Sequence, residues 1–161
     1  ESGIADWGQN AITNGMNANR QWRTLTKNEW QYLISERPNA ASKMGYATVV
    51  YNTYCGVVLL PDNWTDPYED CFISGNGNGF TTNEYNSSQW RQMEAAGAVF
   101  LPAAGRRSNT NIFGSKLFSV YWSSTISNSD NIYTMFFATE DQPKIRTDAR
   151  CYGCLVRLVC E

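Results

Sequence analysis

Only two segments of this 161-residue chain carry the local signals that begin and end an α-helix, and this limits its fold more than any other feature. In the first segment, Thr26 and Glu29 have the spacing of a capping box, in which each side chain accepts the other residue's backbone N–H. Leu25 and Trp30 occupy the two positions of a hydrophobic staple around it. The pattern predicts a helix over about residues 27–36.

The second helix signal begins at Asn86, a good N-cap residue, and Gln89 follows three positions later. Gly97 is a suitable left-handed stop, so the helix is about ten residues long. Elsewhere the pattern is typical of short strands and loops, with strands expected at 47–51, 56–60, 98–101, 121–124, 133–138, 144–147 and 155–159. Helices early in the chain and a run of strands late in it predict an α+β fold.

Composition excludes several classes of protein. Hydrophobic residues form 42% of the chain and charged residues 17%, which is incompatible with disorder. A formal charge of −2 lacks the basic excess that nucleic acid requires. The chain has no His, which removes Ser-His-Asp and Cys-His catalysis and HExxH zinc sites. The longest apolar run, around Val57–Leu60, is too short to cross a bilayer.

The length fits one domain over residues 1–161. Because the chain begins without Met, we expect it to lack an N-terminal segment of a longer protein. We also expect a monomer.

Several motifs, in their order, resemble a known group of domains. Trp22–Trp30 resembles the W-R-L-P-T-x-x-E-W opening of formylglycine-generating-enzyme-like domains. The later motifs resemble the Fibrobacter succinogenes major paralogous domain group; they are Gly56–Asp62, Ala95–Gly97, Leu101–Gly105, Tyr121–Thr125 and Val156–Val159. The resemblance covers nearly the whole chain.

The resemblance implies a C-type-lectin-like fold, with two helices flanking small antiparallel sheets and long C-terminal loops that form a binding face. Members of the group occur in surface lipoproteins of gut Bacteroidetes, which implies an extracellular location at the cell surface. Related folds include hypervariable proteins diversified by retroelements, whose changeable positions concentrate in the same C-terminal stretch.

The C-terminal third is rich in amide, hydroxyl and aromatic side chains that suit recognition. The candidate ligand-binding residues are Asn109, Asn111, Phe113, Ser127, Asn128, Asp130, Asn131, Thr134, Phe136 and Asp148. If Tyr133, Met135 and Phe137 point into the core, alternation turns Thr134 and Phe136 outward. Phe136 is then a binding anchor, unless the sheet is covered on both faces and Phe136 is ordinary core.

An acidic loop offers oxygen ligands of the kind that calcium prefers. Its carboxylates are Asp62, Asp66, Glu69 and Asp70. The chain lacks the Pro-flanked motif of calcium-dependent lectins, so we expect a solvated structural loop and no metal or other cofactor.

The five cysteines fall into two groups. Cys55 and Cys71 could form a disulfide in an oxidising compartment. Cys151, Cys154 and Cys160 invite comparison with the catalytic cysteines of formylglycine-generating enzymes, but their spacing differs and a structural role is favoured. They also lack the further ligands that would close a zinc site.

These observations predict a non-enzymatic ligand-binding or adhesion module of a bacterial surface protein, whose ligand is an unknown protein or glycan. Two alternatives remain open. One is an oxidoreductase resembling formylglycine-generating enzymes, with a C-terminal cysteine as the reactive group. The other is a structural subunit of a larger surface assembly.

Overall fold

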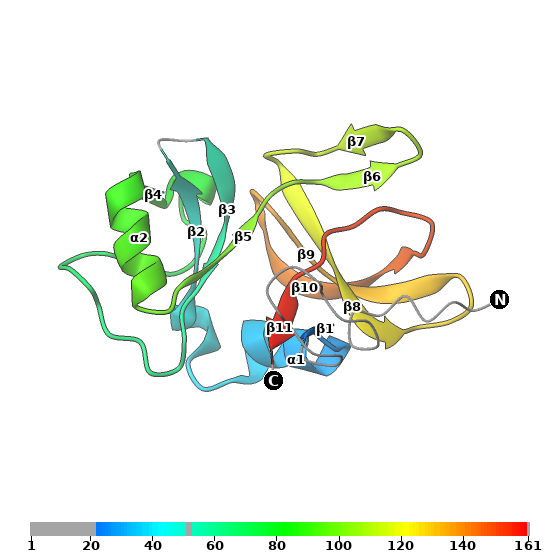
Figure 1. The fold of residues 1–161 in the computed structure, drawn as a ribbon, viewed down its shortest axis with the longest axis horizontal. Helices are drawn as coiled ribbons and strands as arrows, with labels where there is room; N and C mark the ends of the chain where they lie inside the picture. Colours follow the sequence, from blue (N-terminus) through cyan, green and yellow to red (C-terminus); the bar gives the residue numbers. More distant parts are fainter. Residues whose placement is uncertain (1–21, 51–52, 161) are drawn as a thin grey trace.

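The computed structural model describes residues 22–50 and 53–160, which form a mixed α+β fold with two α-helices and four small sheets (Figure 1). The predicted fold class is therefore confirmed at this level. In chain order the elements are β1 (Trp22–Thr24), α1 (Lys27–Gln31), η1 (Tyr32–Glu36), η2 (Ala40–Lys43), β2 (Met44–Val49), β3 (Tyr54–Leu59), η3 (Gly79–Thr81), β4 (Asn83–Tyr85), α2 (Ser87–Ala95), β5 (Val99–Pro102), β6 (Arg106–Ser108), β7 (Asn111–Phe113), β8 (Phe118–Ile126), β9 (Asn131–Ala138), β10 (Asp141–Ala149) and β11 (Leu158–Cys160).

Both helices begin at the predicted capping residues. Thr26 Oγ1 accepts the backbone N–H of Glu29 at 3.2 Å, and Glu29 Oε2 accepts the backbone N–H of Thr26 at 2.8 Å. Residues 32–36 continue the helix as a π-helical turn, closed by the Arg37 N–H donating to Tyr32 O. The first helix thus spans the predicted residues, but only its first half is α-helical.

The second helix, α2, also has a complete capping box at its predicted N-cap. The Asn86 side chain accepts the backbone N–H groups of Ser88 and Gln89, each at 2.9 Å. Gly97 follows the helix with φ +98°, a left-handed conformation that a side chain would strain.

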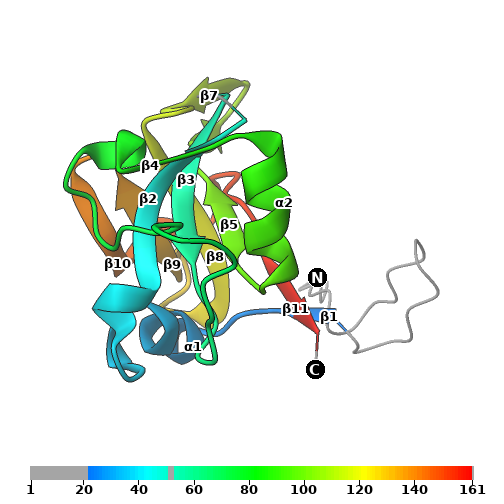
Figure 2. The same ribbon diagram turned by 90° about the vertical axis from the view of Figure 1, so that its left-hand side faces the viewer.

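The N-terminal sheet has the strand order β4-β2-β3-β5 and lies between α2 and the C-terminal strands (Figure 1), which are seen behind it in Figure 2. Alternate residues of β3 explain this position, because successive side chains of a strand point to opposite faces. Val58 packs in one apolar cluster with Trp90 and Met93 of α2. Val57 packs in the other cluster, which is the main core of the molecule.

The C-terminal sheet has the order β10-β9-β8 and is antiparallel throughout. Its inner face supplies Tyr121, Met135 and Phe137 to the main core, where they meet Trp30 of α1 and Leu101 of β5. The predicted inward direction of Met135 and Phe137 is correct.

The two ends of the described chain meet in a ribbon of their own. β1 pairs antiparallel with β11, with Trp22 opposite Cys160 and Thr24 opposite Leu158. Of the strand expected at 155–159, only its end joins this ribbon, while Leu155 makes a single bridge to Tyr121. No helix within the described residues is long and apolar enough to cross a membrane.

Candidate functional site

The outer face of the C-terminal sheet is the face turned away from the main core. Residues directly opposed in antiparallel strands point to the same side of a sheet. Three rows of such residues cross the outer face from β8 through β9 to β10: Val120–Phe136–Lys144, Trp122–Thr134–Arg146 and Ile126–Ile132–Asp148. Charged side chains therefore occupy the β10 end of each row.

Three segments that are far apart in the sequence border the outer face. The β6–β7 ribbon and the segment 150–157 are joined by paired backbone hydrogen bonds between Arg107 and Gly153, at 2.7 and 2.9 Å. The turn between β8 and β9 is joined to the same segment, because the Arg150 N–H donates to Asp130 O at 2.9 Å. All three lie on the right-hand side of Figure 1. Their backbones thus form one connected platform.

Asp148 is the centre of a charged cluster beneath this platform. Its Oδ1 accepts from Arg106 Nη1 at 3.0 Å and from Arg146 Nη2 at 3.1 Å. Its Oδ2 accepts from Arg146 Nε and from the Thr134 hydroxyl, both at 2.7 Å. Asp148 and Thr134 are buried, whereas about a third of each arginine side chain is exposed. We name Thr134, Arg106, Arg146 and Asp148 the Asp148 cluster.

Aromatic rings hold both guanidinium groups of the cluster. The Arg146 guanidinium carbon lies 3.8 Å from the ring centroid of Phe136, and that of Arg106 lies 4.2 Å from the centroid of Tyr152. A guanidinium stacked on a ring leaves its N–H groups at the edge for hydrogen bonds. The rings therefore fix the arginines without using their donors.

One of those donors is unpaired. Arg106 Nε is buried and has no hydrogen-bond partner among the described residues. A buried donor without an acceptor is uncommon in a folded protein and costs free energy. Four other buried side-chain polar atoms of the described residues are also unpaired, so this donor supports a binding site only together with the exposed part of the same guanidinium.

The Cys154 thiol lies in the same surroundings. Burial raises its pKa to about 12; the Asp148 carboxylate adds to this rise, and Arg106 and Arg146 oppose it. A thiol with this pKa is protonated at neutral pH, and only the thiolate is a good nucleophile or metal ligand.

The predicted ligand-binding residues fall into two sets. Those on the β6–β7 ribbon and the β8–β9 turn are exposed: Asn109, Asn111, Phe113, Ser127, Asn128 and Asp130. Asn131 is half-buried, and its N–H and that of Asp130 donate to Asn128 Oδ1, which shapes the turn. The second set, Thr134, Phe136 and Asp148, is buried on the outer face. The structure brings both sets to one side of the molecule.

Phe136 is on the outer face, as alternation predicts, but it is not an exposed anchor. Only 9% of the residue is accessible. Its ring packs against Phe118 at a centroid separation of 5.9 Å and is covered by Arg146 and Lys144. The alternative of a sheet covered on both faces is the correct one at this position.

The expected disulfide between Cys55 and Cys71 is wrong. Both thiols are unpaired. Cys55 packs against the main core and Cys71 belongs to the cluster beneath α2, so the N-terminal sheet separates them.

Two carboxylates of the acidic loop are engaged by other protein groups. Asp62 Oδ1 is paired with Lys43 Nζ at 2.7 Å, and Asp66 Oδ1 accepts from Trp64 Nε1 at 2.7 Å. In the part of the chain that the structure describes, no three His, Cys, Asp or Glu side chains are placed to hold a metal ion. The candidates Asp62, Asp66, Glu69 and Asp70 are therefore loop residues without a common ligand position.

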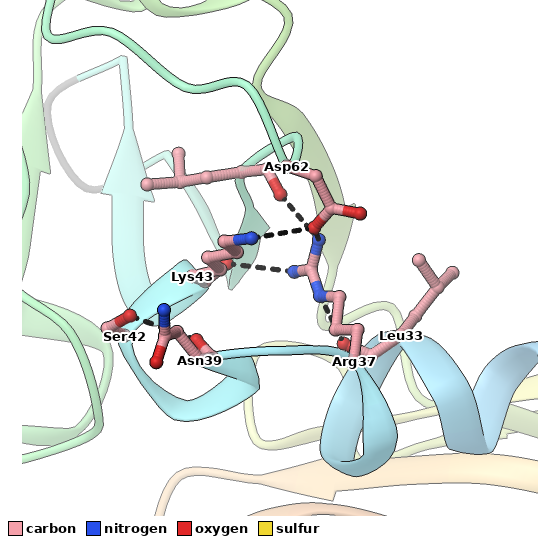
Figure 3. Close-up of polar contacts among 7 residues, drawn as sticks. Leu33, Arg37, Asn39, Ser42, Lys43 and Asp62 are labelled. Carbon is pink, nitrogen blue, oxygen red and sulfur yellow. Dashed lines mark hydrogen bonds and ion pairs between the residues drawn. The ribbon is translucent and has the colours of Figure 1, made fainter.

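Arg37 is buried, and its side chain makes contacts that stabilise the fold (Figure 3). Its Nε donates to Leu33 O at 2.9 Å, its Nη1 to Leu60 O at 2.8 Å and its Nη2 to Lys43 O at 3.3 Å. Its Nη1 also lies 3.4 Å from Asp62. Because each of its nitrogens already has a protein acceptor, Arg37 joins η1 to the ends of β2 and β3 and offers little to a ligand.

The sequence interpretation missed Arg106, Arg146 and Tyr152. One partial signal was present, because Asp148 comes directly after the strand predicted at 144–147 and would share a face with Arg146 if that strand continued by one residue. No local signal places Arg106 beside them, since 42 residues separate it from Asp148.

No protein-family model, curated protein or solved structure matches this chain at a level that indicates relationship.

Proposed function

We propose that this chain is a non-enzymatic ligand-binding module of a bacterial surface protein, with a C-type-lectin-like fold and with the outer face and its bordering segments as the binding surface. The fold assignment and the location rest on the motif resemblance of Trp22–Trp30 and Tyr121–Thr125. The proposed fold is also consistent with the mixed α+β arrangement of two helices and small sheets.

The observation that carries the proposal is the convergence of three sequence-distant segments around the Asp148 cluster. Their backbones are held together by hydrogen bonds, while the side chains of Asn111, Phe113 and Asn128 remain exposed. A rigid platform that presents polar and aromatic side chains is the arrangement that binding surfaces use.

The oxidoreductase alternative is weaker on chemical grounds. A reactive cysteine needs a lowered pKa, and burial raises the pKa of Cys154 instead. Cys151 is exposed.

The proposal is tested by screening the intact chain against arrays of glycans and of surface proteins, with and without calcium. Replacing Asn111 and Phe113 with Ala should weaken binding of any captured ligand by about tenfold or more. The matched control replaces Arg91 and Glu94, two exposed residues of α2. The N-terminal sheet lies between α2 and the C-terminal strands (Figure 1). Equal loss in both double variants, or no ligand in either array, would contradict the proposal.

A further inference from the structure

The two arginines of the Asp148 cluster have unused hydrogen-bond donors, whereas its carboxylate has no unused acceptor. The Asp148 carboxylate accepts four hydrogen bonds, which fills its oxygens. A guanidinium has about five N–H donors; Arg146 spends two on Asp148 and Arg106 spends one. No other hydrogen bond of these two guanidiniums is present among the described residues. A ligand at this position must therefore bring acceptors.

The net charge of the cluster also favours a ligand that brings acceptors, namely an anion. Two guanidiniums and one carboxylate leave the cluster with one net positive charge. Although the whole chain has a formal charge of −2, residues 103–160 contain seven of its 13 Lys and Arg and four of its 15 Asp and Glu. The segment that supplies most of the binding surface is thus the positive part of an acidic chain, which favours an anionic ligand.

The size of this charge favours a carboxylate over a phosphate monoester. A carboxylate carries one negative charge, which matches the cluster, whereas a phosphate monoester carries about 1.5 to 2 at neutral pH. The planar edge of a guanidinium donates two parallel hydrogen bonds to either anion, so it is the charge match that favours a carboxylate.

Apolar side chains flank the cluster. Phe113 lies directly opposite Arg106 in the β6–β7 ribbon, so both point to the same side, and Phe113 is 50% exposed. Ile126, 58% exposed, is in the same row as Asp148. Protein interfaces combine arginine with exposed aromatic and aliphatic side chains. The composition around the cluster therefore favours a protein over a sugar as the source of the carboxylate.

On the basis of the proposed function, we infer that the outer face binds a protein that places one carboxylate, from an Asp or Glu side chain or from a chain terminus, against the exposed edges of Arg106 and Arg146. Apolar residues beside that carboxylate contact Phe113 and Ile126. The partner's carboxylate then gains two charged donors, and Asp148 holds them in place.

The probe is a displayed library of random linear peptides, selected against the full chain. The best peptide is then synthesised with its Asp or Glu residues changed one at a time to Asn or Gln, and with an amidated terminus. We expect one such change to weaken binding by about tenfold or more, as for close charge pairs across interfaces. The Arg106→Gln variant should lose a similar factor, and the two changes together should cost far less than the product of the single losses.

Arg107→Gln is the matched control. It removes the same charge from the adjacent residue, but Arg107 lies opposite Ile112 and points to the other side of the ribbon. We expect its affinity to change less than about twofold. Arg106→Lys keeps the charge but not the planar arrangement of donors, so it should bind with intermediate affinity. It replaces Arg106→Gln in the experiment if that variant is unstable.

Binding by selected peptides that need no carboxylate would overturn the inference, as would equal losses in the Arg106 and Arg107 variants. A screen that yields only a glycan ligand would also overturn it while leaving the proposed function intact. If the peptide library, the glycan array and the surface-protein array all yield no ligand, both fail.

Discussion

Arg106 Nη1 donates to Asp148 Oδ1 over 3.0 Å, and this contact joins the β6–β7 ribbon to β10 of the C-terminal sheet. The ribbon is a separate two-stranded sheet. Its backbone otherwise touches its neighbours through isolated bridges, such as Gly105 with Ser119 and Arg107 with Gly153. The ion pair is therefore a side-chain contact that, together with the Arg107–Gly153 backbone hydrogen bonds, holds the ribbon over the outer face.

Asp148→Asn should lower the free energy of unfolding by about 2 kcal/mol. Removing the carboxylate leaves two guanidiniums side by side without a counter-charge. Their partial exposure places the cost at the low end for a broken buried pair. Urea unfolding of this variant and of Asp130→Asn, which changes an exposed residue of the neighbouring turn, measures the difference. Equal stability of the two variants would contradict it.

Phe136→Ala should destabilise the protein by about 3 kcal/mol, the usual cost of truncating a buried Phe. For a chain of this size that corresponds to a fall in Tm of about 10 °C. Phe113→Ala removes the same ring from the exposed strand β7 and should change Tm by only about 1–2 °C. A thermal melt in which the two variants behave alike would show that the Phe136 ring is not buried.

Arg37→Met should lower the unfolding free energy by about 3 kcal/mol, because it leaves the carbonyls of Leu33, Leu60 and Lys43 without their donor. Lys43→Met is the control, since it removes a neighbouring cation whose only ion-pair partner in the described chain is exposed Asp62. We expect it to cost less than about 1 kcal/mol. Chemical denaturation of both variants tests the contrast.

The sequence predicts those parts of this fold that depend on neighbours in the chain. Thr26 with Glu29 and Asn86 with Gln89 begin helices because capping is satisfied within four residues. Met135 and Phe137 enter the core because alternation along one strand is also local. Such features need no knowledge of the tertiary arrangement.

What the sequence does not predict depends on which segments meet in space. Burial of Phe136 follows from Arg146 and Phe118 on the two neighbouring strands. Separation of Cys55 from Cys71 follows from a sheet that passes between them, although only 15 residues lie between the two in the chain. The exposed members of the candidate site lie in the β6–β7 ribbon and in the β8–β9 turn, whose amide-rich composition is visible in sequence. Its charged centre is assembled from β6, β9 and β10.

Cys154 should resist alkylation in the folded protein. Burial raises the pKa of its thiol to about 12, so almost no thiolate is present at pH 8. Cys151 is exposed and should react much faster. Mass mapping after iodoacetamide treatment, with and without denaturant, measures both sites. Rapid native modification of Cys154 would contradict the assigned environment and would revive the oxidoreductase alternative.

Glu29 should make stability fall with acid below about pH 4.5. The hydrogen bonds from Arg23 lower its pKa from 4.5 to about 2 in the folded protein, with further lowering from Thr26. Since the folded state binds this proton less tightly than the unfolded state, the stabilisation is fully present above pH 4.5 and is lost as the pH falls toward 2. The Arg23 and Glu29 side chains are both about a third exposed, so solvent keeps the change in stability small.

Urea unfolding from pH 6 to pH 2 measures this change. The free energy of unfolding should fall less steeply with acid for Glu29→Gln than for the unaltered chain. Glu84→Gln, which changes an exposed carboxylate on β4, should keep the original slope. Parallel slopes for Glu29→Gln and the unaltered chain would show that the Arg23 contact does not stabilise the first helix.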